Sequence, residues 1–152
     1  MSTNVVVTGA TGTQGGSVID ALASGEYGEF EIRGLTRDAS SERARALAER
    51  GVEVVEGDMH DAERMAELFA DVDRAFVVTT FFESGTDAEI EQGRTAVTAA
   101  AEAGVDHVVY SSVGGADRDT GLAHFESKAA VEETLRGLDV GWTVLRPVFF
   151  MR

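Results

Sequence analysis

Residues 4–24 of the chain read NVVVTGATGTQGGSVIDALAS, and this stretch decides the fold. The β-branched run 4–8 predicts a strand buried on both faces, and residues 17–24 predict a helix that ends near Gly25. Between them, glycines stand at positions 9, 12 and 15. Glycines at this spacing allow a tight turn, a backbone that approaches a diphosphate closely, and a helix packed against the strand. The helix start would present N–H groups and about half a positive charge to the phosphates.

The same loop separates two classes of nucleotide-binding protein. A G-x-x-G-x-x-G run between a strand and a helix is typical of dinucleotide-binding proteins, and a glycine-rich turn without a ligand is the alternative. The chain contains no G-x-x-x-x-G-K sequence, which argues against a Walker-type nucleoside triphosphatase. The sequence therefore predicts that the loop holds a dinucleotide.

Short β-rich runs alternate with longer helical segments over the whole chain, which predicts a parallel sheet covered by helices. After the first strand and helix, the predicted strands are 30–36, 53–56, 75–79, 107–111 and 142–145, and the predicted helices are 41–50, 61–69, 88–103 and 124–136. Ser40 or Asp38 is expected to cap the helix 41–50, and Asp61 the helix 61–69. No linker, repeat or low-complexity stretch interrupts the pattern, so one domain over residues 1–152 is predicted.

The order of these elements is that of the doubly wound Rossmann fold, an α/β fold with three layers, α/β/α. Right-handed crossovers leave the strand order 3-2-1-4-5-6 as nearly the only simple topology. Ligands of such sheets bind beyond the carboxyl ends of the strands, so functional residues are expected there.

Composition excludes several classes of protein. Of the 152 residues, 43% are hydrophobic and 26% are charged, which is typical of a folded globular protein rather than a disordered one. The absence of cysteine excludes disulfides, thiolate metal clusters and a cysteine nucleophile. No apolar run approaches the ~20 residues of a membrane helix, and no signal peptide precedes the first strand, so a soluble cytoplasmic protein is expected.

The net charge of −14 argues against a nucleic-acid partner, because it would repel a phosphate backbone. The basic residues comprise twelve Arg and a single Lys, Lys128. Two explanations of this acidic, lysine-poor composition stay open. One is adaptation to high salt, where dense carboxylates retain hydration, and the other is GC-rich codon usage.

The end of the second predicted strand bears on which dinucleotide is bound. NAD-specific sites place Asp or Glu there to accept from the ribose 2′-hydroxyl, whereas an Arg accommodates the 2′-phosphate of NADP. Arg37 can grip a phosphate and lie over the adenine, which favours NADP, with NAD as the alternative. Asp38 could pair with Arg37, cap the next helix or accept from a 2′-hydroxyl, and of these capping is the expected role. Ser40 and Ser41 follow.

Two further strand ends offer polar groups at the same edge of the sheet. Asp58 could accept from the adenine amine, and Met59 follows it. Thr79 and Thr80, followed by Phe81, would bring hydroxyls beside the nicotinamide ribose. Taken alone, each of these is more often an ordinary cap or turn.

Candidate residues for proton transfer follow the fifth predicted strand. Ser111 closes that strand, and the next helix carries His124 and Lys128 on one face, four residues apart. A short-chain dehydrogenase carries Tyr-x-x-x-Lys at this place, with the lysine on the ribose hydroxyls and a serine polarising the carbonyl. Lys128 is therefore expected to hold the ribose. His124 occupies the tyrosine position and could relay a proton, although half-buried packing is its expected role. The three histidines lie on different elements without ligand spacing, so no metal site is expected.

Several separate motifs, from residue 4 to the end of the chain, together resemble the NmrA-like family of atypical short-chain dehydrogenases/reductases. The motifs are TGATGTQGGS (8–17), Thr36-Arg37, Gly57-Asp58, VVTT with FFES (77–84), HFESK (124–128) and RPVFF (146–150). The resemblance implies an NAD(P)-binding Rossmann domain. It places cofactor contacts on Gly9, Ala10, Thr11, Gly12, Thr13, Gln14, Gly15, Arg37, Asp38, Ser40, Ser41, Asp58, Met59, Thr79, Thr80, Phe81 and Lys128. The segment after the sixth strand, Phe149, Phe150, Met151 and Arg152, would flank the nicotinamide.

The same resemblance implies two functions. Redox-sensing members of the family lack the active-site tyrosine and report the NADPH/NADP⁺ ratio through protein–protein contacts, and HFESK resembles that branch. The first interpretation is therefore an NADP(H)-preferring sensor with a regulatory protein partner. The second is a reductase of a quinone, enone or other small carbonyl, with Lys128 or His124 assisting proton transfer. A Rossmann remnant without cofactor is a third. Family members continue for about another domain, a smaller lobe that is missing here, so a truncated reading frame or a fragment is expected.

Overall fold

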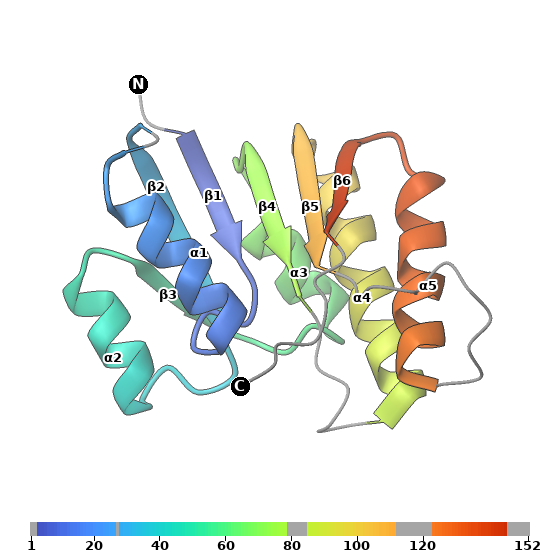
Figure 1. Cartoon of the computed structure of the whole chain (residues 1–152), viewed down its shortest axis with the longest axis horizontal. Helices are drawn as coiled ribbons and strands as arrows, with labels where there is room; N and C mark the ends of the chain where they lie inside the picture. The colour runs from blue at the N-terminus through green and yellow to red at the C-terminus, as the bar shows by residue number, and fades with distance from the viewer. Residues whose placement is uncertain (1–2, 27, 79–84, 112–122, 146–152) are drawn as a thin grey trace.

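Strands and helices alternate strictly along the chain in the computed structural model, which describes the backbone of residues 3–26, 28–78, 85–111 and 123–145 (Figure 1). The strands are β1 (Thr3–Val7), β2 (Phe30–Thr36), β3 (Glu53–Glu56), β4 (Arg74–Val77), β5 (His107–Ser111) and β6 (Gly141–Leu145). The helices are α1 (Thr13–Ala23), α2 (Glu42–Glu49), α3 (Ala62–Leu68), α4 (Gly85–Glu102) and α5 (Ala123–Arg136). None of these helices is both long and apolar enough to cross a membrane.

The six strands form one parallel sheet in the order β3-β2-β1-β4-β5-β6, which confirms the predicted Rossmann topology. In the register of the central strand, Val5 pairs with Ile32 of β2 on one side and with Arg74 of β4 on the other. The chain therefore adds β2 and β3 on one side of β1, and then crosses back to add β4, β5 and β6 on the other side. The reversal creates the switch point at which ligands of such sheets bind.

Alternating side chains of β1 divide the core into two parts, because successive residues of a strand point to opposite faces. Val6 packs with Val97 of α4, in the larger cluster that lies under α3, α4 and α5. Val7 packs with Ile19 of α1 and Leu47 of α2, in the smaller cluster on the other face. The sheet is thus the middle of three layers, as predicted.

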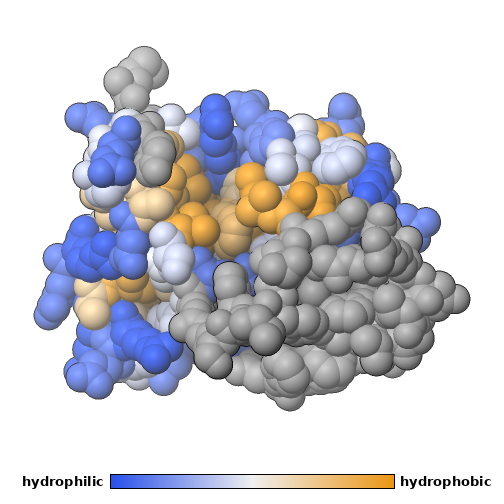
Figure 2. All heavy atoms as spheres, viewed as in Figure 1, coloured by the Kyte–Doolittle hydropathy of each residue, from blue (hydrophilic) through white to orange (hydrophobic). Residues whose placement is uncertain are grey.

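Helices α1 and α2 cover only the β1–β3 half of their face. They contact β1, β2 and β3, whereas the row Val7, Phe76 and Val109 continues across the sheet on the same face. Figure 2, seen from the side of α1 and α2, shows apolar side chains along the middle of the sheet beside these helices. The crevice between the two halves therefore begins where α1 stops covering the sheet.

Most predicted bounds agree with the structure. Strands β2, β3 and β5 match, and the other strands and helices α2–α5 differ at their ends by one to three residues. The predicted start of the first helix at residue 17 is wrong, because α1 begins at Thr13, directly after its N-cap Gly12. Glycines at positions 15 and 16 are poor helix formers, and packing against the strand overrides that weak propensity.

The helix caps correct a second prediction. Ser41, rather than Asp38 or Ser40, is the N-cap of α2, and its Oγ accepts a hydrogen bond of 3.2 Å from the N–H of Ala44. Asp61 caps α3 as predicted, accepting from the N–H of Arg64 at 3.1 Å. Candidate caps that stand one to three residues apart are hard to tell apart from sequence, since each can satisfy the same first-turn N–H groups.

Candidate functional site

One buried side chain links the two strands that meet at the switch point. Thr8, which is fully buried, donates through Oγ1 to the carbonyl of Val78 at 3.0 Å and accepts from the N–H of Val78 at 2.8 Å. Its own N–H donates to the carbonyl of Phe76 at 3.0 Å. The carboxyl ends of β1 and β4 are therefore fixed to each other, and the loop that follows β1 starts from a rigid point.

Glycines shape the loop between β1 and α1. Gly9 has φ of +59°, a conformation that side chains disfavour, and its carbonyl accepts from the N–H of Gly12 at 2.9 Å. A Cβ on Gly15 would lie 2.2 Å from the carbonyl oxygen of Gly9. Helix α1 can therefore pack this closely on the loop only with a glycine at position 15. Ala10 lies buried behind the loop and donates to the carbonyl of Leu35 at 3.1 Å, which ties the loop to β2.

The start of α1 differs from the starts of α2 and α3. Its N-cap is Gly12, which has no side chain to bond the first N–H groups, and its first turn contains no acidic residue. By contrast, α2 and α3 are capped by side chains and carry Glu42 and Glu63 in their first turns. The positive end of the α1 dipole thus has no charge compensation within its own first turn.

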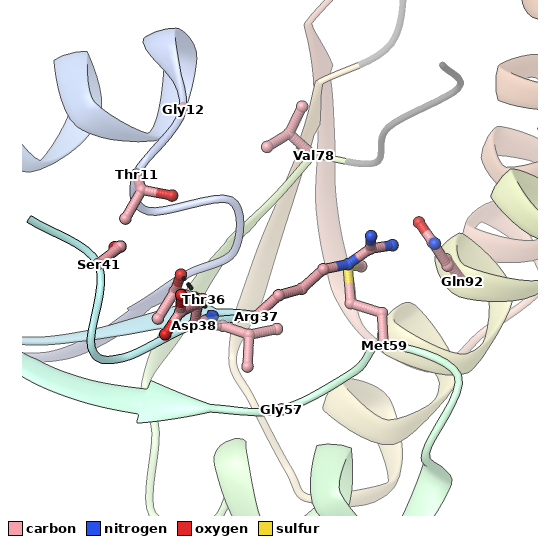
Figure 3. Close-up of a pocket in the computed structure, with 11 residues that line it drawn as sticks. Thr11, Gly12, Thr36, Arg37, Asp38, Ser41, Gly57, Met59, Val78 and Gln92 are labelled. Carbon is pink, nitrogen blue, oxygen red and sulfur yellow. Dashed lines mark hydrogen bonds between the residues drawn. The ribbon is translucent and has the colours of Figure 1, made fainter. Parts of the chain in front are cut away.

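A cavity of about 330 Å³ lies beside this helix start, at the carboxyl ends of β2, β3 and β4 (Figure 3). Thr11 and Gly12 line one side of it, and Gln92 of α4 lines it from the opposite side. The remaining lining residues are Leu35, Thr36, Arg37, Asp38, Ser41, Gly57, Met59 and Val78. Six residues predicted from sequence to bind a cofactor therefore share one cavity: Thr11, Gly12, Arg37, Asp38, Ser41 and Met59.

The end of β2 sets the charge of the cavity. The carboxylate of Asp38 accepts from the hydroxyl of Ser40 at 2.5 Å and from its N–H at 2.9 Å, and these bonds lower the pKa of Asp38. Asp38 thus forms a local turn and remains a carboxylate, instead of capping the next helix. Figure 3 shows the guanidinium of Arg37 extended across the cavity toward Gln92.

The end of β3 contributes Met59, while Asp58 turns toward its own loop. The Asp58 carboxylate accepts from the N–H of His60 at 2.8 Å and lies 3.0 Å from Nδ1 of the same residue. The backbone bond is the main reason that the pKa of Asp58 is lowered. Asp58 is not among the residues that line the cavity, although both of its neighbours are. Its described bonds stabilise the turn after β3.

Gln14 and Ser111 connect the start of α1 to the end of β5. The hydroxyl of Ser111, which is buried at the end of β5, donates to Oε1 of Gln14. The bond joins the first turn of α1 to the strand that precedes the predicted proton-transfer residues. The structure places the backbone of His124 and Lys128 in α5, but their side chains lie outside the part of the chain that it describes.

The predicted contacts at Thr79, Thr80 and Phe81 and at Phe149, Phe150, Met151 and Arg152 also lie outside the described residues, as does the side chain of Thr13. Within the described residues, no three His, Asp or Glu side chains come together in a way that could hold a metal ion.

Two residues at the site were missed by the sequence analysis. Arg43 of α2 donates to the carbonyl of Thr11 at 3.1 Å and so supports the glycine loop. Gln92 is 2% exposed, and its Nε2 is the one buried side-chain nitrogen or oxygen without a hydrogen-bond partner among the described side chains. A polar residue four and eight positions before the buried Ala96 and Ala100 was the available signal for Gln92.

A family model, curated proteins and solved structures are similar to this chain. The model of the NmrA-like family matches residues 1–152. An NmrA-like family domain-containing oxidoreductase of Malbranchea aurantiaca is 38% identical over 138 residues, which are 85% of this chain and 41% of that protein. The NAD(P)H azoreductase of Xenophilus azovorans is 30% identical over 148 residues, which are 97% of this chain and 49% of that protein.

Solved structures agree with this assignment. Triphenylmethane reductase of Citrobacter sp., complexed with NADP(H), superposes with a TM-score of 0.83 and 29% identity over 97% of this chain and 50% of its own. NmrA, a negative transcriptional regulator in complex with NADP, has a TM-score of 0.79 and 26% identity over 94% of this chain and 44% of its own. The chain therefore spans about half the length of these four relatives, or less.

Proposed function

Because the chain belongs to the NmrA-like family, we propose that it binds NADP(H) in the crevice above the switch point. The diphosphate lies at the start of α1, and the adenosine half lies in the cavity beside it. One observation carries this proposal: the start of α1, capped by a glycine and free of acidic residues, opens on the cavity that Arg37 lines. The complexes of triphenylmethane reductase and NmrA with NADP(H) or NADP support it.

The residues present fit the phosphates of this cofactor. In the loop from Gly9 to Gly12 only Ala10 and Thr11 carry side chains, and Ala10 is buried. Thr11 is therefore the one side chain of this loop that could lie between the cavity and the N–H groups at the start of α1. At the end of β2, Arg37 offers the charge that a 2′-phosphate requires. The Asp38 carboxylate already accepts two hydrogen bonds from Ser40, which argues against a role on a ribose 2′-hydroxyl. NADP(H) is therefore preferred over NAD(H).

The bound cofactor would supply hydride transfer at its nicotinamide. The roles of this chain's own residues are to bind and orient it. Gln14 is fixed by Ser111, so the first turn of α1 is held in place beside β5. We assign Lys128 to the hydroxyls of the nicotinamide ribose and place Ser111 near the nicotinamide end of the cofactor. Both assignments rest on the resemblance to Tyr-x-x-x-Lys sites, in which His124 takes the tyrosine position.

The loss of that tyrosine makes a redox sensor our first candidate role, in the cytoplasm. A sensor requires that a protein partner bind the NADPH-bound and NADP⁺-bound forms with different affinities. The second candidate role is a reductase of a quinone or small carbonyl. It is favoured by two relatives, one named as an oxidoreductase and one as an azoreductase, whose similarity extends over 85% and 97% of this chain.

Binding and turnover measurements separate these roles. Calorimetric titration is expected to show NADPH binding, and absorbance of the reduced nicotinamide then follows its oxidation over a panel of quinones and enals. Tight binding without turnover supports the sensor. Turnover that collapses in Lys128→Ala or His124→Ala establishes the reductase. If neither NADPH nor NADP⁺ binds, the proposed function is wrong.

A further inference from the structure

Gln92 is a polar residue on a buried stripe of α4. It lies on the side of the helix that buries Ala96 and Ala100 against the sheet, and it is 2% exposed. Figure 3 shows its amide directed from α4 toward the cavity, where Arg37 reaches across from β2. The residue is therefore placed to contact whatever fills the cavity.

The amide nitrogen of Gln92 lacks a partner. Among the side chains that the structure describes, its Nε2 is the one buried polar atom without a hydrogen bond. A buried donor that bonds neither to protein nor to water weakens a fold, and native proteins contain few of them. A ligand that supplies an acceptor would satisfy this donor.

The surroundings of Gln92 indicate which acceptor fits. The cavity is bordered by the apolar side chains of Leu35, Met59 and Val78, and the guanidinium of Arg37 reaches toward Gln92 (Figure 3). A flat aromatic ring with acceptor nitrogens on its edge suits apolar walls and one neutral donor. A phosphate is instead matched by the charged guanidinium of Arg37, which leaves the neutral amide of Gln92 for an uncharged acceptor.

A dinucleotide has two rings, the adenine and the nicotinamide, and each half of a doubly wound sheet binds one of them. The half formed by β1, β2 and β3 binds the adenosine portion of a dinucleotide. We propose that Nε2 of Gln92 donates a hydrogen bond to a ring nitrogen of the adenine of NADP(H), so that Gln92 recognises the base. This inference rests on the proposed function and extends it to a residue outside the predicted contacts.

Replacing the amide of Gln92 tests the inference, because it should affect the stability of the ligand-free protein and the affinity for the cofactor in different directions. Gln92→Met removes the donor and keeps an unbranched side chain of similar length. We expect the melting temperature of the ligand-free protein to stay the same or rise, because a thioether needs no partner. We expect affinity for NADPH, and for 2′,5′-ADP, which keeps the adenine and the 2′-phosphate but lacks nicotinamide, to fall about tenfold. Thr98→Val, on the same helix but outside the cavity lining, is the matched control and should leave affinity unchanged.

A nitrogen-15 NMR spectrum of the unmodified chain gives a direct second test. The chain contains one Asn and two Gln, so only Asn4, Gln14 and Gln92 give side-chain amide pairs. The pair that disappears in Gln92→Met belongs to Gln92. On addition of 2′,5′-ADP this pair is expected to shift downfield.

Each contrary result has its own meaning. A Gln92 pair that stays in place while backbone amides of α1 shift overturns the inference and leaves the proposed function intact. A marked loss of melting temperature in ligand-free Gln92→Met shows that the amide has a structural bond, and this also overturns the inference. If neither 2′,5′-ADP nor NADPH binds the unmodified chain, the proposed function fails together with the inference.

Discussion

Substituting Gly15 by alanine is expected to destabilise the protein, although alanine is the better helix former. The added Cβ would lie 2.2 Å from the carbonyl oxygen of Gly9, 2.8 Å from the carbonyl carbon of Gly9 and 3.0 Å from the carbonyl oxygen of Thr8. These are backbone atoms, which cannot rotate aside as a side chain can. Moving the Gly9 carbonyl also strains its 2.9 Å hydrogen bond from Gly12.

The magnitude follows from three opposing effects. Overpacking costs about 1–3 kcal/mol, and losing the Gly12 to Gly9 hydrogen bond costs about 0.5–1.5 kcal/mol more. The gain in helix propensity is at most about 1 kcal/mol. The expected net loss in the free energy of unfolding is therefore about 0.5–3.5 kcal/mol. In a chain of this length, at about 3 °C per kcal/mol, it corresponds to a melting temperature lower by about 2–10 °C.

Gly16→Ala is the matched control for this prediction. A Cβ on Gly16 would meet nothing closer than the carbonyl oxygen of Ala10, at 3.9 Å, so this variant should keep or raise the stability. Urea unfolding followed by circular dichroism compares the two variants, which share the same change in composition and in the unfolded chain. If Gly15→Ala proves as stable as Gly16→Ala, the close contact between the loop and α1 does not exist as described.

Three further predictions concern the cofactor, pH and salt. Arg37→Ala should weaken NADPH binding by about 10- to 100-fold and leave NADH binding nearly unchanged, because only NADPH has the 2′-phosphate. Arg74→Ala, at the amino end of β4 and outside the cavity lining, is the control. Calorimetry that finds equal losses for both cofactors would exclude the assignment. The pKa of Asp58 is lowered from its usual 3.8, so its stabilising bonds with His60 are fully present above that pH and are lost as pH falls through the lower, folded-state value. Urea midpoints of Asp58→Asn should therefore depend less on pH below about 4 than those of the unmodified chain, and identical curves would contradict this. If the net charge of −14 reflects adaptation to high salt, the melting temperature rises from dilute to multimolar KCl, whereas an unchanged value favours codon usage.

Sequence reasoning succeeded where a short segment has one physical solution. The run from residue 4 to 15 predicts a strand and a glycine turn ahead of a helix, although the helix start was placed four residues too late, and right-handed crossovers then fix the strand order. Buried strands such as β5 were placed to the residue because β-branched runs between polar residues have clear ends.

The sequence was less informative wherever contacts distant in the chain decide the outcome. The first turn of α1 contains glycines with weak helix propensity, and only packing on the β1 loop shows why it is helical. The roles of Asp38 and Asp58 depend on which nearby N–H groups their carboxylates accept from, which spacing alone does not decide. Gln92 was missed because an amide on an apolar helix face acquires meaning only once the cavity beside it is known.

The central claim is that N–H groups at the start of α1 hold the diphosphate of NADP(H). Backbone amide shifts of Gly12, Gln14 and Gly15, followed by nitrogen-15 NMR during titration with NADPH, test this claim most directly. We expect these amide protons to shift downfield as NADPH binds, and the amides at the start of α2 to move less. If the α1 amides stay in place while NADPH saturates the protein, the diphosphate of the cofactor is bound elsewhere, which contradicts the claim.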